Sequence, residues 1–354
     1  MNLTLHLTEG CNLRCSYCVR VKQPVSMPED ILKAACDLAF SFGSHAGLCF
    51  FGGEPMLERE KILLALDYCV EKSAETGKPV QYKMTTNGTL LDEAFLRRAA
   101  AVHMGIGLSF DGIAQDICRC DAAGKGTQAL LEEKAKLLLR FMPDSCAMMT
   151  VAPQAAEKLA ESVKYLHQLG FQRISAVPAY GQNVQWTDAC FSALSEQLRE
   201  AADYYAAQFL QGKPFFFSPL DSKIRDCIAG VNPSERCHLG FRQMPVAPDG
   251  KIYACTQFIG DDAYMLGDVF HGLDRERQRR LAQRHATPET CKDCALRSRC
   301  TNSCGCTNRL ETGDENRVSP MQCSYERMLI ALADETADRL FDAAPDQFRA
   351  VFAS

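Results

Sequence analysis

The chain has 354 residues, of which 47% are hydrophobic and 23% are charged, and its formal net charge is −5. This composition excludes intrinsic disorder and collagen-like sequence, and the length allows one large domain with a smaller second one. The small net charge disfavours nucleic acid or an anionic membrane as a partner. The first residues lack the apolar segment of an export signal, and no stretch is long and apolar enough to span a membrane. We therefore predict a cytoplasmic protein that binds neither nucleic acid nor membrane.

Short apolar runs alternate with longer segments of helical periodicity up to about residue 209. This alternation is typical of a parallel sheet with right-handed crossover connections. Six strand-helix units are too few for a closed eight-fold barrel, so we predict an α/β fold with a partial (β/α)6 TIM-like barrel. The expected strands are residues 3–7, 47–51, 80–85, 105–110, 147–151 and 173–177. The expected helices are residues 28–40, 60–75, 93–101, 130–141, 154–169 and 192–210.

The texture of the sequence changes at about residue 215, where prolines interrupt the pattern and nine cysteines lie between Cys227 and Cys323. We expect this region to owe its stability to bound metal more than to a core of its own. A last helix is expected over residues 321–340. The predicted division is residues 1–214 for the barrel, 215–330 for a cysteine-rich domain and 331–354 for a C-terminal helix and tail.

The first cysteine cluster follows the first expected strand and has the spacing C-x3-C-x2-C, formed by Cys11, Cys15 and Cys18. The chain has nineteen cysteines, and in a reducing compartment such bunched thiols bind metal more often than they form disulfides. Three thiolates in one loop can bind three corners of a 4Fe-4S cluster and leave its fourth iron open. The alternative is a zinc ion with His6 as a further ligand.

This cluster resembles the signature of the radical S-adenosylmethionine (SAM) enzymes, C-x3-C-x-aromatic-C, with Tyr17 as the aromatic residue. Three further motifs of that family follow successive expected strands: FFGGEP from residue 50, TTNGT from residue 85 and SFDG from residue 109. Each motif stands at the C-terminal end of its strand, where barrels of this kind carry their chemistry.

The resemblance implies that SAM chelates the open iron and that these motifs bind the rest of the molecule. Gly52 and Gly53 would let the backbone approach the ligand, and Glu54 could accept hydrogen bonds from its ammonium group. Arg119 could pair with its carboxylate, although a role within a loop is an equal alternative for that residue. The complete set expected to bind the cofactor is Tyr17, Gly52, Gly53, Glu54, Asn87, Ser109, Asp111 and Arg119.

The C-terminal cysteines resemble the seven-cysteine pattern of the SPASM extension of radical SAM enzymes, which binds two auxiliary 4Fe-4S clusters. That resemblance brings the implied cofactors to three 4Fe-4S clusters and SAM. It assigns Cys291, Cys294, Cys300 and Cys323 to an outer cluster, and Cys237, Cys255 and Cys304 to an inner one. We expect Cys227 to be the eighth ligand, with Cys306 or an open iron for a substrate thiolate or amide as alternatives. Structural zinc would be the other use of such spacings.

The family resemblance implies reductive cleavage of SAM to a 5'-deoxyadenosyl radical, hydrogen abstraction from a peptide or protein, and electron transfer to the auxiliary clusters. The segment around Cys255 is similar to that of thioether-forming maturases of ribosomal peptides (SCIFF type). Sulfatase-maturating enzymes, which make formylglycine, are the alternative. They carry an Asp that serves as the base after that cysteine, where this chain has Thr256. Asp261 and Asp262 lie close by in the sequence. An iron-sulfur electron carrier or a zinc-binding module is the non-enzymatic alternative, and no catalytic residue is assigned.

The implied partners are a peptide substrate and an external one-electron reductant of the flavodoxin or ferredoxin type. Only ten residues precede Cys11, whereas many peptide maturases carry a leader-binding domain before the barrel. A separate protein or the surface of the C-terminal region would then bind a leader, or no leader is bound. The arginine-rich residues 275–284 could hold an acidic leader or form a solvated helix face.

Overall fold

A computed structural model describes residues 2–181, 183–230, 239–241, 243–301 and 304–352. All six expected strands are present, each within two residues of its predicted bounds, and the predicted α/β fold is confirmed. They are neighbours in one sheet, paired in parallel in the order of the chain. The strands are β1 (Asn2–Thr8), β3 (Ala46–Gly52), β4 (Val80–Thr86), β5 (Gly105–Leu108), β7 (Cys146–Val151) and β8 (Arg173–Pro178).

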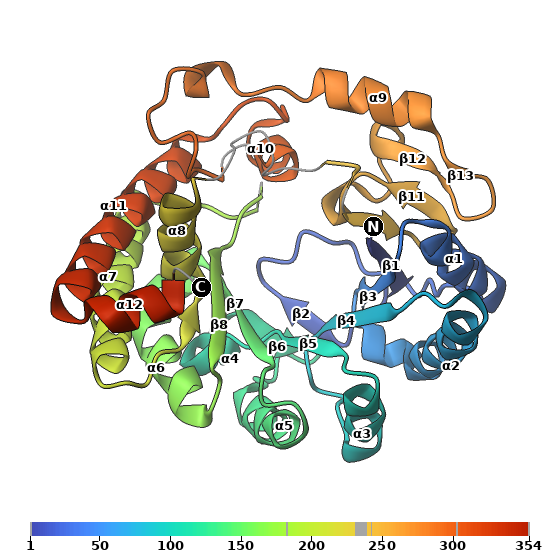
Figure 1. The fold of residues 1–354 in the computed structure, drawn as a ribbon, viewed down its shortest axis with the longest axis horizontal. Helices are drawn as coiled ribbons and strands as arrows, with labels where there is room; N and C mark the ends of the chain where they lie inside the picture. The colour runs from blue at the N-terminus through green and yellow to red at the C-terminus, as the bar shows by residue number, and fades with distance from the viewer. Residues whose placement is uncertain (1, 182, 231–238, 242, 302–303, 353–354) are drawn as a thin grey trace.

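The sheet curves into an open barrel with helices around its outside (Figure 1). Strand β1 is buried on both faces. Its leucines point outward into the core under the helices, and the alternating residues, among them His6, point into the barrel. The expected helix 154–169 begins as the 3-10 helix η3 (Pro153–Lys158). The outer helices are α1 (Glu29–Ser41), α2 (Arg59–Thr76), α3 (Glu93–Ala101), α5 (Gln128–Phe141), α6 (Leu159–Leu169) and α7 (Asp188–Leu210).

Two parallel strands that the sequence did not reveal extend the barrel at its two ends. Strand β10 (Gln243–Val246) pairs with β1, and β9 (Phe216–Phe217) pairs with β8. Beyond β10 the sheet continues in antiparallel pairing through β11 (Lys251–Tyr253), β12 (Met265–Asp268) and β13 (Gly272–Leu273). The part of the sheet that the structure describes therefore has eleven strands, and its C-terminal strands are continuous with the barrel.

The region after residue 214 shares the core of the barrel. Met244, Val246 and Ile252 are fully buried and belong to the same hydrophobic cluster as the barrel strands. These residues thus pack on the core of the barrel rather than forming a core of their own, and stabilisation of the region by bound metal stays a prediction. The predicted division at residues 214 and 330 stays a prediction. The hydrophobic core of the described residues runs across both positions.

The described residues of the C-terminal region include five α-helices. Helix α11 confirms the last expected helix and packs against α7 and α8, while α9 and α10 lie across the open side of the barrel (Figure 1). Among the described residues, no helix combines the length and the apolar character that crossing a membrane requires. The five are α8 (Ser218–Ala229), α9 (Arg275–Arg284), α10 (Gly305–Thr312), α11 (Pro320–Ala343) and α12 (Pro345–Phe352).

Candidate active site

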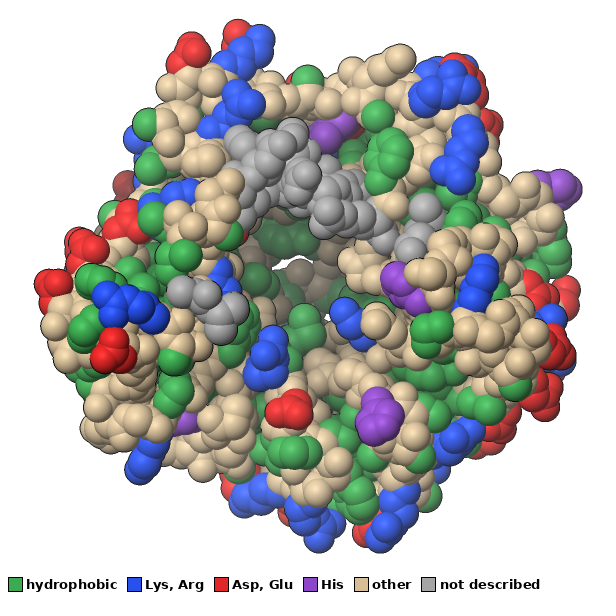
Figure 2. All heavy atoms as spheres, in the orientation of Figure 1, with side chains coloured by type: hydrophobic (Ala, Val, Ile, Leu, Met, Phe, Trp, Pro, Cys, Tyr) green, Lys and Arg blue, Asp and Glu red, His purple; other side chains and the backbone are tan. Residues whose placement is uncertain are grey.

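A cavity of about 430 Å³ lies inside the curve of the sheet, at the C-terminal ends of its strands. Figure 2 shows the molecule hollowed at the centre of this face. We call this space the central cavity. The residues from the sequence motifs that line it are Cys11, Cys15, Tyr17, Cys18, Gly52, Gly53, Glu54, Asn87, Ser109 and Arg119. The structure thus brings together every residue expected around the first cluster and SAM, except Asp111.

A short second sheet holds the first three cysteines at the cavity. Strand β2 (Leu13–Cys15) pairs in antiparallel with β6 (Arg119–Asp121), which places Cys15 opposite Arg119. The backbone N–H of Leu13 donates to the sulfur of Cys11 at 3.4 Å. Burial raises the pKa of Cys11 and of Cys15, and a bound iron would take the place of the thiol proton. These three thiols therefore suit a cluster with one open corner.

Gly52 and Gly53 lie directly against the segment that leads into the cysteine loop. The N–H of Gly53 donates to the carbonyl of Thr8 at 2.8 Å, and the N–H of Glu54 donates to the carbonyl of Gly10 at 2.8 Å. A Cβ atom on Gly53 would lie 2.0 Å from the carbonyl oxygen of Gly10, and Gly52 has a φ of +132°. Only glycine fits this contact, so the motif fixes the cysteine loop as well as lining the cavity.

Glu54 is the best-held carboxylate of the site. Its side chain is buried and accepts hydrogen bonds from the hydroxyl of Thr86 (2.6 Å), the N–H of Asn87 (2.7 Å) and the N–H of Met56 (3.0 Å). Burial raises the pKa of Glu54, and these three hydrogen bonds oppose that effect. The carboxylate is therefore fixed in one orientation at the wall of the central cavity.

Asn87 connects its own turn to the cysteine loop. Its amide donates to the side-chain oxygen of Asn12 at 2.8 Å and approaches the sulfur of Cys11 at 3.9 Å. The amide of Asn12 in turn donates to the hydroxyl of Thr89 at 2.8 Å. These contacts join the TTNGT motif to the first cysteine of the cluster.

Asp111 has a different place from the one that the sequence suggested, because it is not among the residues lining the central cavity. It forms a buried pair with Arg119, with distances of 2.8 Å to Nε and 3.2 Å to Nη2. It also accepts a hydrogen bond from the hydroxyl of Tyr17 at 2.9 Å. The guanidinium of Arg119 lies 5.2 Å from the centre of the Tyr17 ring. Asp111 thus orients the two side chains that do reach the cavity.

Residues outside the selected set also line the central cavity, and His6, Arg20, Tyr180 and Gln257 are among them. Burial and the nearby Arg20 lower the pKa of His6 to about 3, so its imidazole is neutral. The guanidinium of Arg20 donates to the carbonyl of Thr256 at 3.1 Å and so joins the first cysteine loop to the C-terminal region. The sequence suggested His6 only as a zinc ligand, and the one signal for Tyr180 was its position just after a strand.

A second group of thiols lies beside the central cavity. Cys306 lies 3.3 Å from Cys304, sulfur to sulfur, and its thiol also forms a hydrogen bond with Cys255. That hydrogen bond lowers the pKa of Cys255 to about 7. Tyr180 lies next to these thiols and also lines the cavity. We call Cys255, Cys304 and Cys306 the inner thiols; Cys237, expected with them, lies outside the described residues.

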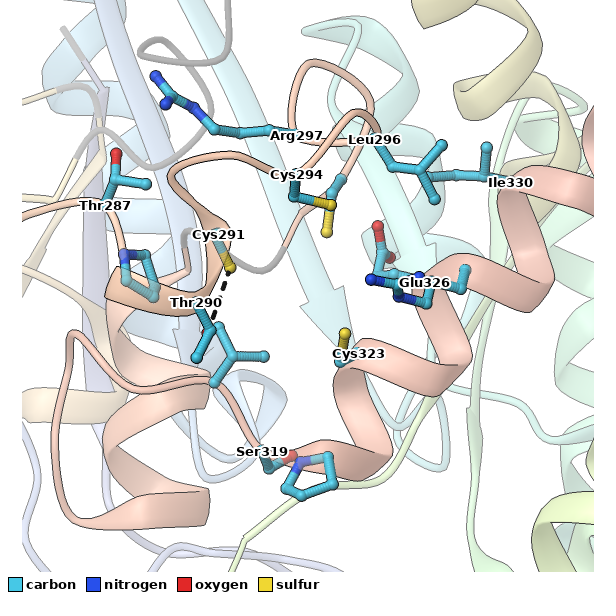
Figure 3. A pocket seen from close by; sticks show the side chains of 15 residues that line it. Thr287, Thr290, Cys291, Cys294, Leu296, Arg297, Ser319, Cys323, Glu326 and Ile330 are labelled. Atoms are coloured by element: carbon cyan, nitrogen blue, oxygen red, sulfur yellow. Dashed lines mark hydrogen bonds between the residues drawn. The ribbon is translucent and has the colours of Figure 1, made fainter.

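A third group surrounds a separate cavity of about 330 Å³, lined by Cys291, Cys294, Cys300 and Cys323. Figure 3 shows Cys291 and Cys294 on one side of this space and Cys323 on the facing turn of α11. The structure thus brings together all four cysteines expected around the outer cluster, and we call them the outer thiols. Four thiols around one enclosed space suit a 4Fe-4S cluster with four protein ligands.

Cys227, the expected eighth ligand, is exposed on α8. Its thiolate would help to raise the pKa of Arg299, which precedes Cys300. In the part of the chain that the structure describes, no three Cys, His, Asp or Glu side chains surround a single point closely enough to bind one metal ion.

Comparison with known proteins agrees with this site. The model of the radical SAM superfamily matches residues 5–175, which include the cysteine loop and all three following motifs. The match runs from β1 into β8 and agrees with the resemblance that the four motifs carry.

Individual relatives extend the likeness into the C-terminal region. A cysteine-type anaerobic sulfatase-maturating enzyme of Clostridium perfringens (strain 13 / Type A) is 22% identical over 333 residues, which is 87% of this chain and 89% of that protein. The antilisterial bacteriocin subtilosin biosynthesis protein AlbA of Bacillus subtilis (strain 168) is 23% identical over 281 residues, or 77% of this chain and 58% of AlbA.

A solved structure matches almost the whole fold. It is native anSMEcpe, an anaerobic sulfatase-maturating enzyme, with bound AdoMet and Cp18Cys peptide. The match has a TM-score of 0.83 at 20% identity and covers 98% of this chain and 99% of that one. At this identity the likeness establishes the shared fold, including the C-terminal region.

Proposed function

We propose that this chain is a radical SAM oxidoreductase that modifies a peptide, forming a thioether or a related crosslink. Relatives named for sulfatase maturation and for bacteriocin biosynthesis support a peptide or protein substrate. The structural relative holds a cysteine-containing peptide together with AdoMet. The central cavity, with the first cysteine loop on one side and the inner thiols on the other, is where such a peptide would bind.

The residues that would hold the cofactors follow from the three thiol groups. Cys11, Cys15 and Cys18 would bind the cluster that chelates SAM, and Glu54 and Arg119 would face its amino and carboxylate groups. When bound, this pair of cofactors supplies a one-electron cleavage that allows hydrogen abstraction from an unactivated carbon. The inner and outer thiols would bind two auxiliary clusters, and an external reductant of flavodoxin or ferredoxin type would deliver the first electron.

The proposed product keeps the sulfur of a substrate cysteine and lacks two hydrogens. One C–H bond and one S–H bond of the peptide break, and one C–S bond forms. The carbon loses a hydrogen atom to the deoxyadenosyl group, and the thiol loses a proton to solvent. One electron leaves the peptide for an oxidised auxiliary cluster, which closes the balance.

The observation that favours a thioether over formylglycine is the set of carboxylates at the cavity. Thr256 lines the central cavity. At the corresponding sequence position, sulfatase-maturating enzymes carry an Asp that serves as the base. Neither Asp261 nor Asp262 is among the lining residues, and Asp261 pairs with Arg309 at 3.3 Å. Among the described residues that line the cavity, Glu54 is the one carboxylate, and three hydrogen bonds already hold it. None of the described residues that line the cavity therefore offers a free carboxylate to act as the base in formylglycine formation.

The arginines of α9 give little support to a leader-binding role. Arg277 pairs with Asp274, Arg279 with Glu276, and Arg284 with Glu315. Pairing within the same surface is what a solvated helix face shows. A separate leader-binding protein stays a possible partner in this proposal.

The test uses anaerobically reconstituted protein with SAM, a one-electron reductant and a short cysteine-rich peptide encoded beside this chain. We expect 5'-deoxyadenosine and a peptide that has lost two hydrogens and resists thiol alkylation, both measured by mass spectrometry. Cys15→Ala should abolish both products, while Cys120→Ala, on the facing strand and outside the cavity lining, should retain them.

A sulfatase-derived peptide containing Cys or Ser serves as the competing substrate. Conversion of that peptide to a hydrazide-reactive aldehyde, with no reaction of the cysteine-rich peptide, would establish formylglycine formation and contradict our proposal. Failure of the wild-type protein to cleave SAM would favour an iron-sulfur electron carrier instead.

A further inference from the structure

We propose that Cys306 binds iron of the inner auxiliary cluster beside Cys255 and Cys304. This inference rests on the proposed function, because it requires that the C-terminal cysteines bind clusters. The SPASM pattern supplies the inner cluster with three cysteines, and Cys306 lies outside that pattern. With Cys306 as a fourth ligand, the protein alone would coordinate all four irons, and none would be left for a substrate group.

The position of Cys306 among the described thiols is the first observation. It is the shared partner of the other two inner thiols, 3.3 Å from the sulfur of Cys304 and hydrogen-bonded to Cys255. Its residue is 7% exposed, so the thiol is sheltered from solvent. The cysteines of a 4Fe-4S cluster bind different irons, so these thiols would separate around the cluster, and Cys306 is close enough to the two expected ligands to reach one of its irons.

The local backbone brings two thiols to one end of a helix. Cys304 is the N-cap of α10, and Cys306 is the second residue of that eight-residue helix. Between them, a Cβ on Gly305 would lie 3.0 Å from the ring of His285, so this residue has little room for a side chain. The Cys-Gly-Cys sequence thus places two thiols close together at the beginning of the helix.

Packing as an inert thiol is the other explanation for a buried cysteine. This chain contains such a case in Cys36 and Cys69, which are fully buried in the barrel core and hydrogen-bonded to each other. The inner thiols differ, because Cys255 and Cys304 are only partly buried and lie beside Tyr180 at the central cavity. A site at the edge of a cavity suits electron exchange with a substrate, which a thiol pair within the core does not.

Full coordination by protein assigns the inner cluster a definite role. A cluster without an open iron cannot bind the substrate thiol, so it can only accept an electron from the substrate radical. Tyr180 and Gln257, joined by a hydrogen bond of 3.3 Å, lie at the wall between the central cavity and this cluster. The substrate cysteine would then react free in the cavity.

The test compares Cys306→Ser with Cys227→Ser, the competing ligand, and with Cys36→Ser as the matched buried-thiol control. Each protein is reconstituted anaerobically, and iron per chain, the EPR spectrum after reduction and SAM cleavage without peptide are measured. Wild-type protein should contain about twelve irons per chain. Cys306→Ser should fall to about eight irons or show a changed auxiliary EPR signal, and should keep SAM cleavage as evidence that it is folded.

We expect Cys227→Ser and Cys36→Ser to match the wild type in iron and spectrum. An unchanged Cys306→Ser protein, or a Cys227→Ser protein with the same loss as Cys306→Ser, would overturn this inference alone. A wild-type protein with only about four irons per chain would overturn the auxiliary clusters, and with them the proposed function.

Discussion

Lys223 and Glu326 form an ion pair of 2.6 Å that is almost completely buried between α8 and α11, with 2% and 5% of their side chains exposed. The ammonium of Lys223 also donates to the carbonyl of Arg299 at 2.9 Å. The carboxylate of Glu326 accepts from the N–H of Thr301 at 2.8 Å and from its hydroxyl at 2.7 Å. The pair therefore holds the residue before Cys300 and the residue after it.

Replacing one partner should damage both stability and the outer cluster. Glu326→Gln or Lys223→Met leaves a buried charge without its partner, which costs about 3–5 kcal/mol in the free energy of unfolding. We expect a lower apparent Tm and loss of outer-cluster iron, measured by calorimetry and iron analysis. The control is Glu335→Gln, which breaks the exposed pair with Arg199 and should cost less than about 1 kcal/mol. Equal effects of the buried and exposed replacements would refute the positioning role.

The contact between Gly53 and Gly10 predicts a specific loss at the first cluster. Gly53→Ala would force a methyl group against the carbonyl of Gly10 and displace the segment before Cys11. We expect loss of SAM cleavage and of about four irons per chain, measured by EPR and iron analysis. Gly105→Ala is the matched control, because a Cβ at this strand residue would meet Lys83 at an ordinary 3.7 Å. A Gly53→Ala protein with an intact first cluster would contradict this account.

Glu54→Gln should weaken SAM binding with little change in fold. The amide keeps one acceptor oxygen for the hydrogen bonds that now hold Glu54, but it lacks the negative charge that would face the amino group of SAM. Loss of a hydrogen bond to a charged group costs about 1.5–3 kcal/mol, so the Kd for SAM should rise roughly 10- to 150-fold. Equilibrium dialysis would measure it. Glu58→Gln, in the same 3-10 helix η1 (Pro55–Glu58) but paired with Lys61, should bind SAM as the wild type does.

Asp221 predicts a pH dependence of stability. Burial raises the pKa of its carboxyl to about 6, against an ordinary value of 3.8. The folded state then holds this proton more tightly than the unfolded state, so its contribution to stability falls as pH rises through 6. Between pH 5 and pH 7 the loss is about 1.4 kcal/mol.

Asp221→Asn should remove that slope, because the amide oxygen can still accept from the N–H of Phe217. Melting curves at pH 5, 6 and 7 would give the slope for the wild type and the variant. Asp342→Asn, at an exposed position of α11, is the control and should follow the wild-type profile. An unchanged pH profile in Asp221→Asn would contradict the assignment to Asp221.

The barrel and its motifs could be predicted from sequence because their signals are local. Each strand of the first half is a short apolar run, and each motif follows a strand, so parallel pairing alone brings the motifs to one edge. The motif residues that line the central cavity could be predicted from this parallel pairing. Asp111 shows its limit, because a carboxylate after a strand can face the cavity or a neighbouring arginine, and only the fold decides between them.

The C-terminal half could not be predicted to the same degree, because its elements depend on distant partners. Strand β10 has four residues, one of them Pro245, and it is a strand because β1 lies beside it. Helix α8 has a proline as its second residue and carries few apolar residues, so periodicity did not reveal it. The grouping of Cys306 with Cys255 was also hidden, because 50 intervening residues fold before the two thiols meet.

The pairing of β1 with β10 sets an order of events during synthesis. Residues 2–5 leave the ribosome before their partners at 243–246, which follow some 240 residues later. At about 5–20 residues per second, one edge of β1 waits roughly 10–50 seconds for its partner. An apolar strand with an open edge is prone to pair with other chains. The nascent protein therefore has a period in which rapid translation or a chaperone would improve its yield.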